Sequence, residues 1–266
     1  DSPYQAFAKP EYSGFAAVGC REMSQIPDVL LTELQENFLE DSPIVTILND
    51  EISAESSCRE SPRMMVFHRP DGSLGYLIHL ALPLDALSER SEGELIDLTV
   101  QQLENADFPN GLKQLVRLSP PANMLHRPYY IHRTTLTNSL QFPSTASFNT
   151  ENQSREIQPA WSAGRVVLVG DAAHGMPPFR AQGANQGLED ALTVVMLIAN
   201  IRDNHYWNDM PAIDKAFEKY ERLRRPFMVH IQKATLEPFD RSQKQWEEYG
   251  QQVYLRDFDQ VLKALL

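Results

Sequence analysis

The first half of the chain alternates short apolar runs with turns, a pattern typical of β-strands. Residues 12–20 (YSGFAAVGC) predict one strand, and residues 124–133 (MLHRPYYIHR) predict another that is interrupted at Pro128. Residues 62–83 contain two apolar runs joined by a Pro-Asp-Gly turn, which predicts a β-hairpin. This part of the chain is therefore expected to form an antiparallel sheet.

Two stretches in the same half repeat their apolar residues at helical spacing. Residues 27–41 and 92–106 each place apolar side chains near one face of a helix. We expect these helices to join the strands in a mostly antiparallel β-sheet domain over residues 1–155. The stretch 134–160 is rich in Ser, Thr, Asn and Gln and is expected to be a long surface loop or linker.

A different pattern follows this stretch. The apolar run 165–169 (RVVLV) is typical of a buried strand, and apolar residues then recur at helical spacing over 183–201. Residues 156–203 are thus expected to form a strand, a loop and a helix. Residues 204–266 are expected to be helical, with Pro226 ending or kinking one helix. The expected fold class combines α+β and α/β features.

Composition and charge limit the classes of partner that the chain can bind and indicate its cellular compartment. The 266 residues carry a net charge of −12, which disfavours nucleic acids and anionic membranes because both require a basic face. The longest apolar run, 191–199, is shorter than the ~20 residues that span a bilayer. Two cysteines, Cys20 and Cys58, form no disulfide framework. We therefore expect reduced thiols and a cytoplasmic protein.

One stretch, GDAAHGMPPFRAQGANQGLEDA at 170–191, carries the candidate chemistry. Asp171 directly follows the predicted strand, and ligands of α/β sheets bind beyond the carboxyl ends of strands. Its carboxylate could accept hydrogen bonds from two sugar-type hydroxyls, or it could simply cap a turn. Gly183 permits a close backbone approach. The helix that starts there presents free N–H groups to an anion or to developing negative charge.

These features suit a cofactor with a polyol chain and a ring that becomes anionic, and a reduced flavin has both. The stretch also resembles the second FAD-binding motif of the class A flavoprotein monooxygenases, the p-hydroxybenzoate hydroxylase-like family. The flanking Trp161, the run GRVVLV at 164–169 and YERLRRP at 220–226 agree with this resemblance. One departure is Ala181, which stands where the family often has Gly.

The resemblance implies a division of the chain and roles in its loop. Residues 1–155 would be the substrate-binding sheet domain, 156–203 part of a Rossmann-like FAD-binding domain, and 204–266 the C-terminal helices. Asp171 would bind the ribityl chain of FAD and Pro177 would lie beside the isoalloxazine ring, whose pyrimidine edge the next helix would meet. The implied cofactor-binding residues are Gly170, Asp171, Pro177, Gly183, Ala184 and Asn185.

The resemblance also implies a reaction. NADH or NADPH would reduce the FAD, O2 would add at the flavin C4a, and the resulting hydroperoxide would hydroxylate an aromatic or other cyclic organic substrate. Because the cofactor carries this chemistry, no catalytic triad and no metal site are expected. The alternatives are a halogenase or reductase of the same superfamily, or a non-catalytic remnant. The sequence contains no Trp-x-Trp-x-Ile-Pro signature, which disfavours the usual halogenases.

The front half of that family is not found in this sequence. The family opens with a βαβ unit whose G-x-G-x-x-G turn binds the FAD pyrophosphate. None of the 12 glycines here stands two positions from another. We therefore expect the chain to lack an N-terminal FAD-binding segment, through truncation or because it is half of a split enzyme. The unit at 161–203 would then expose apolar surface that this segment should cover.

Overall fold

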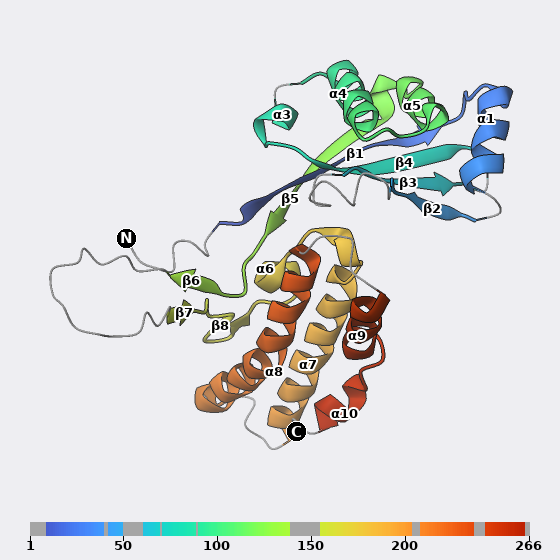
Figure 1. The fold of residues 1–266 in the computed structure, drawn as a ribbon. Coiled ribbons are helices and arrows are strands. Elements are labelled where there is room, and N and C mark those ends of the chain that lie inside the picture. The colour runs from blue at the N-terminus through green and yellow to red at the C-terminus, as the bar shows by residue number, and fades with distance from the viewer. Residues whose placement is uncertain are drawn as a thin grey trace, which may run out of the picture. The chain divides into compact units, whose positions relative to one another are not determined.

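The computed structural model describes residues 9–39, 42–49, 61–69, 71–88, 90–138, 155–203, 208–236 and 243–263. The chain divides into two compact units, whose elements are labelled in Figure 1. The sheet unit comprises the described residues of Tyr12–Tyr129. The helical unit comprises the described residues of Asp1–Glu11, Tyr130–Glu237 and Gln243–Leu266.

The sheet unit is built on a five-stranded sheet with the strand order β2-β3-β4-β1-β5. Neighbours are antiparallel where β1 meets β4, where β2 meets β3 and where β3 meets β4. The strand predicted at 12–20 and the hairpin predicted at 62–83 are confirmed as β1 and as β3 with β4, although Pro70 lies outside the described residues. The strands are β1 (Glu11–Met23), β2 (Ile44–Ile47), β3 (Arg63–His68), β4 (Leu74–Ala81) and β5 (Met124–Ile131).

The predicted interruption of the last strand at Pro128 is wrong. β5 runs unbroken from Met124 to Ile131 and includes this proline. The strand order places β5 at an edge of the sheet. A proline without an N–H group costs little there, because one side of an edge strand has no ladder to complete.

Helices supply the apolar partners of one sheet face. Alternate residues of β4, namely Leu74, Tyr76, Ile78 and Leu80, are buried in one core with side chains of the helices. Figure 1 shows α4 and α5 along this sheet. The helix predicted at 92–106 is confirmed as α4. The helices are α1 (Asp28–Leu34), η2 (Gln35–Leu39), α3 (Asp85–Ser88), α4 (Glu92–Asn105), α5 (Asn110–Arg117) and η3 (Pro121–Asn123).

The single thiol that the structure describes lies in this unit. Cys20 is buried on β1 and carries a free thiol, as the cysteine content led us to expect. Cys58 lies outside the described residues. Among the described residues of the whole chain, no helix combines the length and the apolar character needed to cross a bilayer.

The helical unit contains two long helices, α7 and α8, which lie side by side in Figure 1. Its core includes Trp161, Phe217, Tyr220, Met228 and Ile231. Its strands are β6 (Leu136–Asn138) paired with β7 (Arg155–Ile157), and β8 (Ser162–Ala163) paired with β9 (Val166–Val167). Its helices are α6 (Asp171–His174), η4 (Pro178–Arg180), α7 (Gly183–Asp203), α8 (Met210–Leu236), α9 (Gln243–Val253) and α10 (Phe258–Lys263).

The buried strand predicted at 165–169 is mostly wrong. Only Val166–Val167 are in a strand, and they pair antiparallel with Ser162–Ala163. A buried parallel strand requires neighbours on both sides. Among the described residues β9 pairs with β8 alone, so the apolar run keeps only a local hairpin.

The expectation that Pro226 ends its helix is also wrong, since α8 continues to Leu236. The proline lacks the N–H that would bond to the carbonyl of Arg222. Both residues are exposed, so water can take the place of that hydrogen bond. Met228 and Ile231 beyond the proline are fully buried and hold the rest of the helix against the core.

The exposed apolar surface predicted for 161–203 is confirmed. Along one side of α7, Leu188 is 70% exposed and Val195 is 63% exposed, with Leu192 and Ile198 between and beyond them. Val166 before the loop is 64% exposed. We call Leu188, Leu192, Val195 and Ile198 the apolar stripe of α7.

Candidate functional site

The loop between β9 and α7 brings the two parts of the predicted site together. Gly170 has a φ of +57°, and α6 then turns once and carries Asp171 at its start. The Asp171 side chain is exposed and lies beside the first turn of α7. A Cβ atom on Gly183 would stand 3.8 Å from Oδ1 of Asp171, so a larger side chain there would occupy the space next to the carboxylate.

The other predicted cofactor residues lie on the same loop. Ala184 and Asn185 are exposed in the first turn of α7, whose N-terminus begins at Gly183 as predicted. Pro177 is buried just before η4. The site thus combines an exposed carboxylate with the free N–H groups and the positive end of a long helix. The roles of these residues toward FAD stay predictions.

Ala181 shows how the loop accommodates its departure from the family pattern. Its φ and ψ are 52° and 31°, which is the left-handed region that glycine adopts most easily. The backbone therefore keeps the conformation that a glycine would favour, at a cost of about 1 kcal/mol for an alanine.

A buried carboxylate beneath the loop holds it to α7. Oδ2 of Asp190 accepts the backbone N–H of Gly170 at 2.8 Å and lies 2.5 Å from Nε2 of His174. Both side chains are fully buried. His174 therefore fixes the loop through a hydrogen bond to Asp190.

Arg224 on α8 completes this network. Its Nε donates to Oδ1 of Asp190 at 2.6 Å, and its Nη1 donates to Glu189 at 2.5 Å. Its Nη2 donates to the side chain of Gln186 at 2.7 Å and to its carbonyl at 3.1 Å. Arg256 forms a further ion pair with Glu189. Each of the three guanidinium nitrogens of Arg224 thus donates to an acceptor on α7.

The charges of this network act on the pKa of Asp190. Burial by itself raises that pKa, but the hydrogen bond to His174 and the charges of His174 and Arg224 outweigh it and lower the pKa below its usual value. Tyr220, whose hydroxyl donates to the carbonyl of Leu168 at 3.1 Å, has a raised pKa because it is buried and lies near Asp190. Asp190 is therefore ionised in the folded chain at neutral pH.

Sequence reasoning missed this network. Arg225, the next residue on α8, is also buried, stacks 4.1 Å above the Trp161 ring and pairs with Glu221 at 2.7 Å. Asp190 and Arg224 were not singled out at all. A weak signal existed for Arg224, because Tyr220 and Met228, one turn before and after it, belong to the apolar core.

The cluster of His and Tyr residues near the end of β5 divides between two environments. Tyr130 is 40% exposed. Tyr129 is instead buried, and its hydroxyl lies 3.0 Å from Nδ1 of His79 in the sheet unit. Arg133 pairs with Glu11 in the helical unit.

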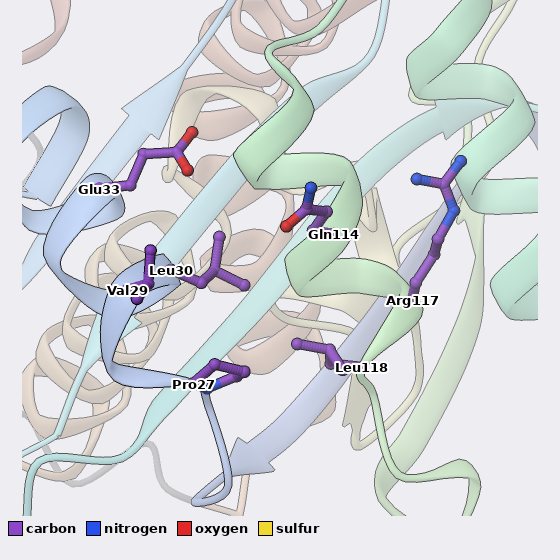
Figure 2. A pocket seen from close by; sticks show the side chains of 7 residues that line it. All are labelled: Pro27, Val29, Leu30, Glu33, Gln114, Arg117 and Leu118. Carbon is purple, nitrogen blue, oxygen red and sulfur yellow. The ribbon is translucent and has the colours of Figure 1, made fainter.

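A groove in the sheet unit lies between α1 and α5 and has a volume of about 390 Å³ (Figure 2). Its charged side chains belong to Glu33 and Arg117, and Arg117 pairs with Glu104 at 2.5 Å. The other residues that line the groove are Pro27, Val29, Leu30, Gln114 and Leu118.

Among the described residues no three His, Cys, Asp or Glu side chains are grouped as a metal ion would require.

Comparison with known proteins confirms the resemblance. Residues 130–234, which contain the whole loop, match the FAD binding domain family. Salicylate hydroxylase of Pseudomonas putida is 40% identical over 79 residues, which are 30% of this chain and 17% of that protein. The 3-amino-4-hydroxybenzoate 2-monooxygenase PtmB3 of Streptomyces platensis is 35% identical over 107 residues, 39% of this chain and 23% of that protein.

Solved structures show the same fold over a longer stretch. A salicylate hydroxylase in a substrate complex superposes with a TM-score of 0.60 at 17% identity, and covers 97% of this chain and 57% of its own. CtdE in complex with FAD gives a TM-score of 0.56 at 16% identity, and covers 96% of this chain and 55% of its own. The chain therefore spans little more than half the length of these neighbours, and its sequence matches cover less than a quarter of the curated relatives.

The residues present fit a flavin. The exposed Asp171 carboxylate is an acceptor for vicinal hydroxyls, and Gly183 keeps the adjoining space open. The N-terminus of the 21-residue helix α7 begins at that same glycine and favours negative charge. Both features lie inside the stretch that matches the FAD binding domain.

Proposed function

We propose that this chain is the rear portion of an FAD-dependent monooxygenase that hydroxylates an aromatic or other cyclic organic compound. The observation that carries the proposal is the exposed Asp171 carboxylate beside Gly183 at the N-terminus of α7. This arrangement stands within the matched residues 130–234. The relatives' names, which refer to salicylate and an aminohydroxybenzoate, favour a hydroxylated aromatic acid as the substrate.

Each loop residue receives a role in this proposal. Asp171 accepts hydrogen bonds from the ribityl hydroxyls, and Gly170 gives the backbone the left-handed turn that aims it. The first turn of α7, with Ala184 and Asn185, faces the pyrimidine edge and favours its negative charge. Pro177 stiffens the loop beside the ring. Bound FAD would supply the redox chemistry, with NADH or NADPH as the reductant and O2 as the co-substrate.

The apolar stripe of α7 supports a second part of the proposal. Four large apolar side chains on one side of a helix are seldom left to water in a finished fold. The exposed Val166 adds apolar surface in the segment that leads into the loop. We propose that a FAD-binding segment with a G-x-G-x-x-G turn covers this surface and holds the pyrophosphate of the cofactor. The free Cys20 thiol supports a cytoplasmic setting for the assembly.

Flavin retention on a desalting column tests the proposal. The purified chain is mixed with FAD, alone and together with the N-terminal portion of a full-length relative, and the flavin absorbance that elutes with protein is measured. We expect stoichiometric flavin only when the N-terminal portion is present. Asp171→Ala should lose that flavin, whereas the control Asp97→Ala, which changes an exposed aspartate of the sheet unit, should keep it.

The other results have definite meanings. Flavin retained by the chain alone would overturn the need for a covering segment. No flavin under either condition would overturn the FAD-binding function and favour a non-catalytic remnant. Once flavin is bound, oxidation of NADH and NADPH with and without hydroxybenzoates separates a hydroxylase from other flavoproteins of the superfamily.

A further inference from the structure

We propose that Asp190 is a positioning residue that sets the orientation of Asp171 toward the flavin. This inference rests on the proposed function and assigns a task to a residue that never reaches the cofactor-facing surface. Its side chain is fully buried, and it lies on α7 about two turns after Gly183. The proposal is carried by the way a single carboxylate contacts both ends of α6.

The two contacts bracket the turn that carries Asp171. Gly170, the residue before α6, donates its N–H to Oδ2 of Asp190, and His174, the last residue of α6, meets the same oxygen through Nε2. A helix of four residues has too few hydrogen bonds to be stable by itself. Its conformation therefore depends on an external group, and Asp190 is the buried group that contacts both ends.

Asp190 also fixes where this turn stands relative to α7. Asp190 and Gly183 belong to the same helix, so the Asp171 carboxylate and the N-terminus of α7 are held by one rigid element. Gly170 is packed against Gly187 of that helix as well: a Cβ on Gly170 would stand 3.6 Å from the Cα of Gly187. The spacing between the carboxylate and the helix N-terminus is thereby set from beneath the loop.

The carboxylate is in turn prevented from rotating. Oδ1 of Asp190 accepts Nε of Arg224 at 2.6 Å, so its two oxygens face different partners. The Trp161 ring packs against the His174 ring, with the centroids 5.6 Å apart. Nδ1 of His174 has no hydrogen-bond partner among the described residues, so the contact with Asp190 is the polar contact that the structure shows for this ring.

Hydrogen exchange of the free chain tests the positioning without any cofactor. Asp190→Asn keeps the volume of the side chain but turns an NH2 group toward one set of donors. We expect exchange protection at the amides of 170–175 to fall about 10-fold or more, as the loss of a hydrogen bond to a charged group predicts. Protection along α8, where Arg224 keeps its contacts with Glu189 and Gln186, should fall several-fold less than at 170–175, whereas a merely structural defect would raise exchange equally throughout the helical unit.

Two further variants keep the test decisive. Ser119→Ala removes a buried hydroxyl that lies 2.7 Å from Tyr76 in the sheet unit, and it should leave exchange at 170–175 unchanged. If Asp190→Asn does not fold, His174→Gln replaces it, since this variant leaves Asp190 with its contacts to Arg224 and Gly170. It should raise exchange at the end of α6. Unchanged exchange at 170–175 in the folded variant overturns the proposal.

Flavin affinity then decides whether the positioning serves the cofactor. With the N-terminal portion of a relative present, the Kd for FAD should rise about 10- to 100-fold in Asp190→Asn. A wild-type chain that binds FAD and a variant that binds it equally well would overturn this inference alone. A wild-type chain that binds no FAD would instead overturn the proposed function, and with it the flavin part of this inference.

Discussion

Gly170 and Gly187 lie so close that a Cβ atom added to either would stand 3.6 Å from the Cα of the other. Gly170 also has a φ of +57°, where an L side chain is strained. Gly170→Ala should therefore lower the free energy of unfolding by about 1–2 kcal/mol, measured by urea denaturation. The control Gly93→Ala, at an open position of α4, should be neutral or slightly stabilising. Equal effects of the two changes would contradict this account.

Arg224 is expected to be the most sensitive charged side chain of the helical unit. Arg224→Met leaves the buried Asp190 without its cation, and unpaired buried charges are costly. We expect a loss of about 3–5 kcal/mol in the free energy of unfolding, followed through tryptophan fluorescence, to which the buried Trp161 contributes. Arg222→Met, at an exposed position on the same helix, should change it by less than about 0.5 kcal/mol. A loss below about 1 kcal/mol for Arg224→Met would refute the network's importance.

His79 should make the sheet unit sensitive to mild acid. Burial, with a smaller effect of the Arg63 charge, lowers the pKa of His79 to about 4. The unfolded chain, with a pKa near ~6.5, takes up the proton first as the pH falls. Stability is therefore highest above pH ~6.5 and declines toward pH ~4, by at most roughly 3 kcal/mol.

The variant His79→Gln isolates this contribution from that of the carboxylates. Urea unfolding followed by circular dichroism is compared between pH 4 and pH 7 for both proteins. The difference between wild type and variant should change across this window, with the wild type losing more stability in acid. Parallel curves would show that His79 does not titrate differently on folding.

The apolar stripe should govern association rather than folding. Leu188 and Val195 are 70% and 63% exposed, so replacing both with Ser removes little buried area. The double variant should change the free energy of unfolding by less than about 1 kcal/mol, while lowering self-association in sedimentation and weakening binding of a FAD-binding segment. A strongly destabilised double variant would mean that this side of α7 is buried in solution.

The sequence predicted local elements better than long-range ones. The 12–20 strand, the 62–83 hairpin and the start of α7 at Gly183 follow from short-range periodicity and turn chemistry, and all are present. The run at 165–169 failed because a strand also depends on its neighbours, which periodicity does not reveal. The breaks predicted at Pro128 and Pro226 did not occur, because Pro128 lies on an edge strand and Pro226 lies on an exposed face of its helix.

The candidate site divides in the same way. Asp171 and Gly183 could be singled out because a carboxylate after an apolar run and a glycine before a helix are legible in the sequence. The network below them could not, because the partners Asp190 and Arg224 are 34 positions apart and meet only when α7 packs against α8. Ion pairs between helices carry no fixed spacing in the chain.

The N-terminus of α7 is the proposed site for FAD, and the apolar stripe of the same helix is the proposed site for the covering segment. Because both sites lie on one helix, the two binding events are thermodynamically linked. If covering the apolar stripe steadies the helix and so raises the affinity for FAD by some factor, FAD must raise the affinity for the covering segment by that same factor. FAD would then stabilise the complex between this chain and the covering segment. Its concentration would determine how much of the assembled protein exists.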